Sequence, residues 1–167
     1  MFFEEHAKLL ADFARVSQAA GARADYVQGG GGNTSVKLPG GLMAIKASGF
    51  CLSDIHPDQA YAVLDGADLR NFYLTTEPSE LADVEKEGSA RAKADVRHID
   101  GLADLRPSVE AGFHSILKTF VVHTHSVYAN LAACSTACRP IAAQAFAGAN
   151  YTWGWVPYTD PGANLTC

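Results

Sequence analysis

Two histidines spaced by one residue, His123 and His125, carry the side chains best placed in this sequence to bind a metal ion. They follow an apolar run, Phe120-Val121-Val122, which is typical of a β-strand. Alternate side chains of a strand point to the same face, so both imidazoles would face one way. Imidazole nitrogens bind zinc at about 2.0–2.1 Å, so one ion can bridge them. The alternative is a pair of structural histidines that bond to neighbouring backbone.

A glutamate that could join these histidines lies just upstream, in a predicted helix from Ser108 to about Lys118. Ser108 is a favourable N-cap residue. Glu110 follows in the first turn and His114 lies one turn further along the same face. The predicted strand follows this helix at once, so the chain returns antiparallel and Glu110 can meet His123 and His125. The apolar stripe of the helix consists of Val109, Phe113, Ile116 and Leu117.

A glycine-rich run, Gly29-Gly30-Gly31-Gly32-Asn33-Thr34-Ser35, could bind an anion. Glycines let backbone amides approach a ligand closely, and successive amides form a concave site for anions. The run lacks both the third glycine of a dinucleotide fingerprint and the Gly-Lys-Ser/Thr end of a P-loop. The alternative is a flexible connector.

The strands that follow this run favour the anion site. Residues 35–38 and 42–47 read as a hairpin closed by Pro39-Gly40-Gly41. The open ends of a hairpin lie together, and here they are the glycine-rich run and the turn Ser48-Gly49. Two polar loops therefore converge on one place, which suits a phosphate.

The remaining segments supply the elements that must position these groups. We expect an amphipathic helix from Phe2 to Gly21 and a strand at 60–64, while residues 67–105 have little periodicity and read as a surface connection. After His125 the pattern predicts four further pieces. They are a helix at 128–135 broken by Arg139-Pro140, a helical turn at 141–146, a strand at 153–158, and a helix capped by Asp160-Pro161.

Composition restricts the class of protein. The 167 residues fit one domain, and the formal net charge of −5 without a basic patch argues against nucleic acid as a partner. No apolar run is long enough to span a membrane, and the acidic N-terminus is not a signal peptide. Cys134 and Cys138 would share a helix face, where two small buried residues are favoured over a metal site. A reduced, cytoplasmic protein is the expectation.

Taken together, the motifs resemble the class II aldolase/adducin family, with detail closest to the aldolase half of bifunctional rhamnulose-phosphate aldolase/dehydrogenases. They occur in the order of the family and cover most of the chain. The matching pieces are Gly32-Asn33-Thr34-Ser35, Lys46-Ala47-Ser48-Gly49, Pro107-Ser108-Val109-Glu110 with His114, Val122-His123-Thr124-His125, and Tyr158-Thr159-Asp160-Pro161-Gly162.

The resemblance implies an α/β fold, a three-layer α/β/α domain with a mostly antiparallel central sheet, in a homotetramer with active sites near subunit interfaces. It implies one zinc ion per chain, held by three histidines of which two match His123 and His125. Glu110 would be the general acid/base. The phosphate of the substrate would lie at positions that match Gly32, Asn33, Ser48, Gly49 and Ser108.

The implied activity is that of a zinc-dependent lyase that cleaves a ketose 1-phosphate through an enediolate. Two departures bear on it. Val109 stands where many members of the family have a second serine. The third histidine ligand of the family would follow His125, but no histidine does, so we expect residues 1–167 to be one domain that lacks its C-terminal part. Two alternatives stay open: a sugar-phosphate decarboxylase or epimerase on the same scaffold, and a non-enzymatic, adducin-like interaction module.

Overall fold

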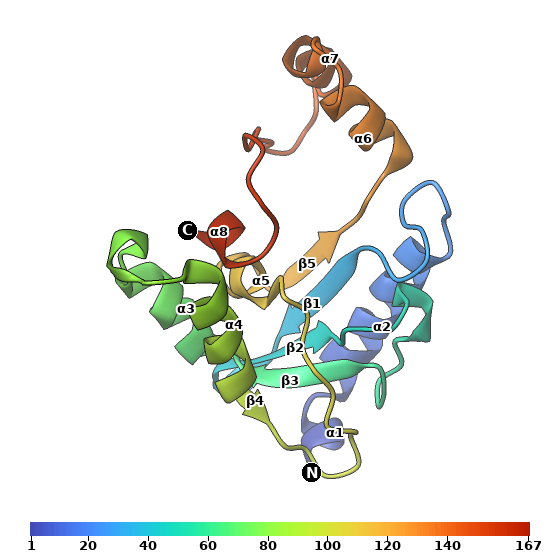
Figure 1. Ribbon diagram of the computed structural model, residues 1–167. Helices are drawn as coiled ribbons and strands as arrows, with labels where there is room; N and C mark the ends of the chain where they lie inside the picture. Colours follow the sequence, from blue (N-terminus) through green and yellow to red (C-terminus); the bar gives the residue numbers. More distant parts are fainter.

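A five-stranded antiparallel sheet lies between two layers of helices in the computed structural model, which describes all 167 residues (Figure 1). The strand order is β4-β3-β2-β1-β5, and every neighbouring pair is antiparallel. The predicted three-layer α/β fold with an antiparallel sheet is therefore confirmed. The strands are β1 (Asn33–Lys37), β2 (Leu42–Lys46), β3 (Tyr61–Asp65), β4 (Val96–Arg97) and β5 (Phe120–His123).

Eight α-helices and three short 3-10 turns accompany the sheet. The helices are α1 (Phe2–Glu5), α2 (Ala7–Gly21), α3 (Gly66–Thr75), α4 (Val84–Ala94), α5 (Ala111–Ile116), α6 (Val127–Ala133), α7 (Cys138–Ala145) and α8 (Ala163–Thr166). The turns are η1 (Pro39–Gly41), η2 (Leu52–Asp54) and η3 (Pro78–Glu80). The predicted N-terminal helix is present, with a break at His6 between α1 and α2. Every helix is too short or too polar to cross a lipid bilayer.

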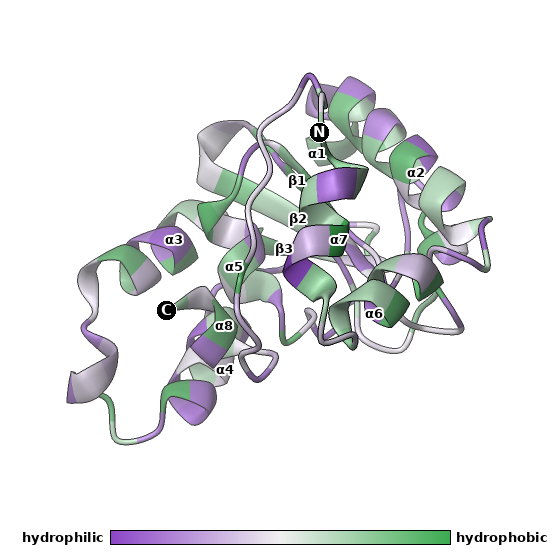
Figure 2. Ribbon diagram, turned by 90° about the horizontal axis from the view of Figure 1, so that it is seen from above, coloured by the Kyte–Doolittle hydropathy of each residue, from purple (hydrophilic) through white to green (hydrophobic).

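Alternation along the strands creates a core on each face of the sheet. In β3, Tyr61 and Val63 pack with Phe13 of α2 on one face. Ala62 and Leu64 point the other way and pack with Leu69 of α3, together with residues of α4 and α5. Burial of each large apolar side chain contributes about 1.5–3 kcal/mol. Accordingly α2, which covers one face only, has both hydrophilic and hydrophobic residues on its surface in Figure 2.

The predicted hairpin is confirmed, and its register fixes the site-bearing strands. β1 and β2 pair with Ser35 opposite Ile45, and the turn passes through Gly40 and Gly41, both at positive φ. On its other side β1 pairs with β5, with Asn33 opposite His123. The end of the glycine-rich run and the end of the histidine strand are therefore adjacent.

The prediction that residues 67–105 form only a surface connection is wrong. They contain most of α3, all of α4 and the edge strand β4. The side chains of Asp65 and Asp83 cap the two helices by accepting bonds from backbone amides. Each helix buries only two residues, one of them a glycine, so no broad apolar stripe marks them in the sequence.

Several expectations for the C-terminal third are also corrected. Residues 153–158 form no strand; they run as exposed irregular chain because no neighbouring strand is available to pair with them. Pro140 lies in the first turn of α7, where a missing amide costs little, and so does not break a helix. Gly162 is the N-cap of α8, not Asp160. Cys134 and Cys138 belong to different helix ends and are not buried.

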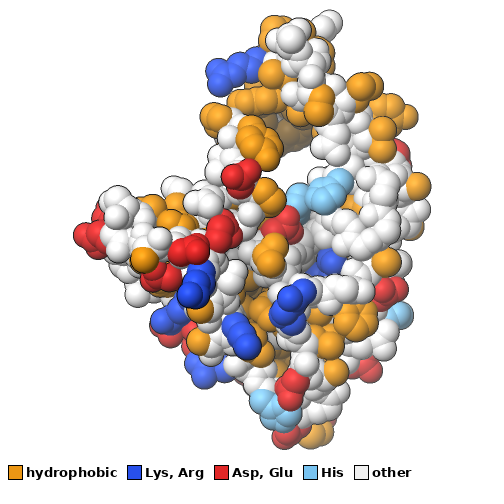
Figure 3. Space-filling view, in the orientation of Figure 1, with side chains coloured by type: hydrophobic (Ala, Val, Ile, Leu, Met, Phe, Trp, Pro, Cys, Tyr) orange, Lys and Arg blue, Asp and Glu red, His pale blue; other side chains and the backbone are white.

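The helices α6 and α7 form an arm that extends away from the sheet (Figure 1). Neither helix buries a residue, and hydrophobic side chains gather over this part of the molecule in Figure 3. The two helices and the chain around Trp153 and Trp155 enclose an apolar groove of about 500 Å³. Apolar surface of this kind is typical of a contact with another protein surface.

Candidate active site

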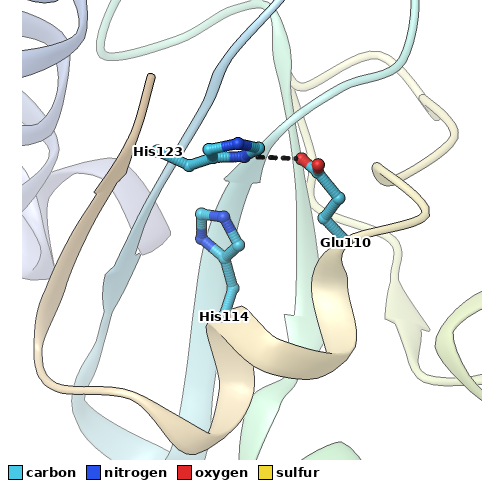
Figure 4. Close-up of side chains that lie close together, drawn as sticks. All are labelled: Glu110, His114 and His123. Carbon is cyan, nitrogen blue, oxygen red and sulfur yellow. Dashed lines mark hydrogen bonds and ion pairs between the residues drawn. The ribbon is translucent and has the colours of Figure 1, made fainter. Parts of the chain in front are cut away.

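Glu110 and His123 meet at the end of the sheet, as the helix–strand geometry predicts. His123 Nδ1 lies 3.2 Å from Glu110 Oε2 (Figure 4), and Asn33 Nδ2 donates to the same oxygen over 3.2 Å. Glu110 is the N-cap of α5, His123 is the last residue of β5, and Asn33 is the first residue of β1. Three elements therefore fix one carboxylate.

The start of α5 differs from the prediction. The helix begins at Ala111 and spans six residues, so Ser108 is not its N-cap. The Ser108 hydroxyl instead accepts a bond from the Glu110 amide over 3.3 Å. Val109, which was expected in the apolar stripe, is 61% exposed. The segment before the helix is held by β-type pairing of Pro107 with Ala47, which delays the first helical turn.

His114 lies one turn along α5 from Glu110 and is completely buried. Its Nδ1 lies 2.8 Å from the hydroxyl of Ser35, on strand β1 next to β5. Its Nε2 is buried without a hydrogen-bond partner. One ligand atom from each of Glu110, His114 and His123 lies within 4.8 Å of the others, so these three side chains form one cluster (Figure 4).

His125 lies next to this cluster but outside the strand. β5 ends at His123, so the alternation of a strand does not extend to His125, contrary to the sequence prediction. The two rings are nevertheless neighbours, with centroids 4.9 Å apart. The glycine-rich run passes beside His125, because a Cβ on Gly31 would come 3.0 Å from His125 Nδ1.

Burial and hydrogen bonding set the ionisation of the cluster. Burial acts to raise the pKa of Glu110, but the hydrogen bonds from His123 and Asn33 outweigh it, so the pKa lies below its ordinary value. Burial lowers the pKa of His114 to about 3, although the nearby Glu110 acts in the opposite direction. At neutral pH the cluster therefore contains a carboxylate and a neutral imidazole, both of which can bind a cation.

Lys46 joins the two loops whose convergence the hairpin predicted. Its buried Nζ donates to the carbonyl of Gly30 over 3.3 Å and to that of Phe50 over 2.7 Å. Burial lowers the pKa of Lys46, while Cys51, Glu110 and Asp54 act to raise it. The predicted convergence of the glycine-rich run on the loop at Ser48 and Gly49 is thus confirmed.

The other predicted phosphate residues lie around this junction. The Ser48 hydroxyl donates to the carbonyl of Pro107 over 3.2 Å, and the Ser48 amide donates to the carbonyl of Arg106. Gly49 has a φ of 91° and open space beside its Cα. Gly32 is tightly packed, because a Cβ there would come 2.9 Å from the carbonyl oxygen of His123. The loop at Ser48 is therefore tied to the segment that leads into α5.

The cluster fits a divalent metal ion of the zinc type. Its donors are a carboxylate and imidazole nitrogens, which suit zinc. Two buried atoms, His114 Nε2 and Asn33 Oδ1, have no partner within the protein. Buried polar atoms are normally bonded, so these two atoms are available to a bound group.

Three of these residues had no individual role from sequence reasoning. His114 was placed on the same helix face as Glu110 by its four-residue spacing, Ser35 was part of the glycine-rich run, and Lys46 was part of the second hairpin strand. The roles of Lys46 and Ser35 depend on carbonyl and imidazole partners that only the folded chain brings near.

The family model described as Class II Aldolase and Adducin N-terminal domain matches residues 11–166. This chain is a member of the class II aldolase/adducin family. The match includes Asn33, Glu110, His123 and every other residue of the cluster. The comparison with curated proteins gives no match.

Solved structures of class II aldolase-like domains share the fold. The N-terminal class II aldolase domain of a conserved protein from Thermoplasma acidophilum superposes with a TM-score of 0.73 at 22% identity, covering 92% of this chain and 70% of that one. YgbL from Klebsiella pneumoniae, named as a candidate aldolase/epimerase/decarboxylase, gives a TM-score of 0.51 at 18% identity. That match covers 78% of this chain and 50% of YgbL, so this chain spans half the length of that relative.

Proposed function

We propose that this class II aldolase domain is a zinc-dependent lyase that cleaves a ketose 1-phosphate between two carbons. The observation that carries the proposal is the position of Glu110, whose Oε2 is bonded by both Asn33 and His123 beside a second, buried imidazole. A fixed, ionised carboxylate next to metal-binding nitrogens is the combination that proton transfer at a carbon beside a carbonyl requires.

Glu110 is the general acid/base in this proposal. In the cleavage direction it takes the proton of the hydroxyl on the carbon that becomes the aldehyde, the adjacent carbon–carbon bond breaks, and it returns the proton to the carbon next to the carbonyl, which keeps the electron pair. Its lowered pKa keeps it ionised at neutral pH and so ready to accept a proton. Asn33 and His123 orient the carboxylate, which removes the entropic cost of aligning it in each turnover.

The loops around Lys46 hold the phosphate of the substrate. Backbone amides of Gly32 and Gly49 and the side chains of Asn33, Ser48 and Ser108 are the groups that we assign to it. Binding energy at this remote phosphate orients the reacting carbons against Glu110. The overall negative charge of the chain makes such local donors necessary for an anionic substrate.

His123 and His125 are the residues that we assign to the metal, with Glu110 as a further ligand in the resting state. A bound divalent cation would supply a Lewis acid that polarises the substrate carbonyl, an effect of several kcal/mol. The neighbouring rings of the two histidines and the unpartnered atoms beside them support this assignment.

A decarboxylase or epimerase of a sugar phosphate is a second candidate on the same residues. The name of YgbL as a candidate aldolase/epimerase/decarboxylase favours it, since the same fold carries all three descriptions there. These reactions differ in which bond of the substrate breaks next to the carbonyl, so product analysis separates them.

A protein-interaction module is a third candidate, and the arm favours it. Helices α6 and α7 bury no residue and leave Tyr128 and Leu131 more than two-thirds exposed. In the enzyme proposal the same surface is a contact between copies of this chain in a homotetramer. The state of the metal site distinguishes the two, because an interaction module has no need of one.

The metal content of the purified chain tests the proposed function. We expect about one zinc ion per chain after loading and dialysis, and a loss of most of it in the His123→Ala variant. His98→Ala, at an exposed histidine outside the cluster, is the matched control and should retain zinc. Absence of bound metal from the wild type in excess zinc would exclude the lyase and leave the interaction module.

A further inference from the structure

We propose that Lys37 is a positioning residue for the reaction, because it fixes the helix that begins at Glu110. This inference rests on the proposed role of Glu110 as the acid/base. Lys37 is the last residue of β1, and its ammonium donates a hydrogen bond to the backbone carbonyl of His114 in α5. Arg70 of α3 shares the task. Neither side chain acts on the substrate itself; both act through the position of α5.

Alternate side chains of β1 bind α5 along its length. Side chains two residues apart in a strand share a face, and Asn33, Ser35 and Lys37 have this spacing. Asn33 donates to Glu110 Oε2 over 3.2 Å, at the start of the helix. The Ser35 hydroxyl lies 2.8 Å from His114 Nδ1, and Lys37 reaches the carbonyl of the same residue. Figure 4 shows Glu110 and His114 projecting from this one helix, which a single strand therefore holds at its N-cap and in its second half.

The last carbonyls of α5 depend on side chains for their hydrogen bonds. The final four carbonyls of a helix have no partner within it. Leu117 follows α5 with a ψ of −176°, so the chain leaves in an extended conformation without a further turn. Lys37 bonds to one of these carbonyls, and Arg70 donates to those of Ser115 and Ile116. Two cations therefore anchor the end of α5, where the helix dipole favours positive charge.

The short length of α5 carries this anchor through to Glu110. The helix has six residues and spans about 9 Å, too short to keep its direction without contacts at both ends. Glu110 is its N-cap, so a shift at the far end of the helix moves the carboxylate. A misplacement of about 1 Å in a reacting group can slow a reaction about 100-fold. Loss of the Lys37 bond would therefore slow proton transfer.

The ammonium of Lys37 has a single hydrogen-bond partner, the carbonyl of His114. Burial and the nearby Arg70 lower the pKa of Lys37 to about 8, so at neutral pH it keeps the proton that it donates. Burial of a charge without a carboxylate beside it costs stability, which an apolar side chain of the same length would avoid. The hydrogen bond to α5 is thus what a lysine adds at this position.

The rate of proton exchange tests the proposal. The assay follows deuterium uptake by dihydroxyacetone phosphate in heavy water, with zinc-loaded protein. Lys37→Met keeps the length of the side chain and loses the donor. We expect its kcat to fall about 10- to 100-fold, with KM and zinc content within about twofold of the wild type. Lys37→Arg keeps a cationic donor and should recover most of the loss. Lys118→Met, at an exposed lysine just after α5, is the matched control and should behave as the wild type.

The pattern of kcat and KM separates positioning from a general structural role. An unchanged kcat in Lys37→Met would overturn the proposal. A parallel loss of kcat, substrate affinity and zinc that Lys37→Arg does not restore would also overturn it. If Lys37→Met does not fold, Arg70→Gln decides, because Arg70 is exposed on α3 and its loss should lower kcat at constant KM. An unchanged kcat there would refute the anchoring of α5. Wild type without exchange would refute the proposed function as well, whereas exchange that Lys37→Met leaves intact refutes this proposal alone.

Discussion

Asn33 and His123 lie opposite each other on neighbouring strands, and their side chains bond to the same atom, Oε2 of Glu110. The second oxygen of this carboxylate has no hydrogen-bond partner in the protein. One oxygen is therefore fixed by the sheet while the other stays free. This arrangement suits a group that must keep its position and still exchange a proton.

The close packing of Gly32 against β5 predicts that Gly32→Ala will disturb the site. A Cβ there would lie 2.6 Å from Val27 Cγ1 and 2.9 Å from the carbonyl oxygen of His123, at a φ of 71°. We expect the free energy of unfolding to fall by about 1–3 kcal/mol, and zinc affinity to fall with it. Gly30→Ala, in the same run, meets nothing closer than 3.8 Å and should behave as wild type. Equal stability of the two variants in urea unfolding would contradict the packing argument.

The burial of His114 predicts a loss of stability in mild acid. The pKa of His114 is lowered to about 3 in the folded chain, so its imidazole stays neutral in mild acid. In the unfolded chain the same imidazole binds a proton below about pH 6.5. The unfolded state therefore binds more protons, and the free energy of unfolding of the apoprotein should fall as pH drops from about 6.5 towards 3. The effect is on the order of a few kcal/mol.

Urea unfolding at several pH values measures this dependence. Glu110, whose lowered pKa acts in the same direction, contributes only below about pH 4.5. The slope between about pH 6.5 and 4.5 should therefore be smaller in His114→Gln and unchanged in Glu110→Gln. A slope in His114→Gln equal to that of the wild type would show that another group is responsible.

The bridge made by Lys46 predicts that Lys46→Met will weaken anion binding. The variant loses the bonds to Gly30 and Phe50 that hold the two loops together. We expect the dissociation constant for inorganic phosphate to rise at least about 10-fold, because the amides of the loops lose their common orientation. Lys8→Met removes the same charge from an exposed site on α2 and should leave phosphate binding unchanged. Calorimetric titration compares the two, and equal weakening in both would assign the effect to net charge.

The exposed face of the arm predicts an oligomer that a single charge disrupts. Leu131 on α6 is 72% exposed, and a glutamate there would have to be buried unpaired in any contact that uses this face. We expect Leu131→Glu to reduce the molecular mass in sedimentation equilibrium to that of a smaller assembly. Leu74→Glu, at a leucine 61% exposed on α3, is the control and should keep the mass of the wild type. A wild type that is already monomeric would refute the prediction.

Much of the fold and the centre of the site follow from the sequence, for identifiable reasons. Strands β2 and β3 are almost continuously apolar because both faces of the sheet are covered by separate cores. The meeting of Glu110 with His123 follows from a helix that leads directly into a strand. Both inferences depend on local periodicity and chain direction, which a sequence records.

The remainder depends on contacts between distant residues. Helices α3 and α4 are weak in the pattern because each buries only a narrow strip. The aromatic run from Trp153 has the composition of a strand, yet no strand lies beside it. The environment of His114 is set by Ser35, which lies 79 positions away in the sequence. The two loops are held together by Lys46, which bonds only to the carbonyls of Gly30 and Phe50. Residue type alone does not reveal such partners.

Proton exchange at dihydroxyacetone phosphate in heavy water tests the central claim most directly. This compound is the phosphate-bearing half of any ketose 1-phosphate cleaved between its third and fourth carbons, so the unknown aldehyde half is not needed. We predict zinc-dependent uptake of deuterium at the hydroxymethyl carbon, detected by NMR, and a rate 10²–10⁴-fold lower in Glu110→Gln with its fold intact. No exchange by zinc-loaded wild type, or equal exchange by Glu110→Gln, would contradict the assignment of Glu110 as the acid/base of an aldolase.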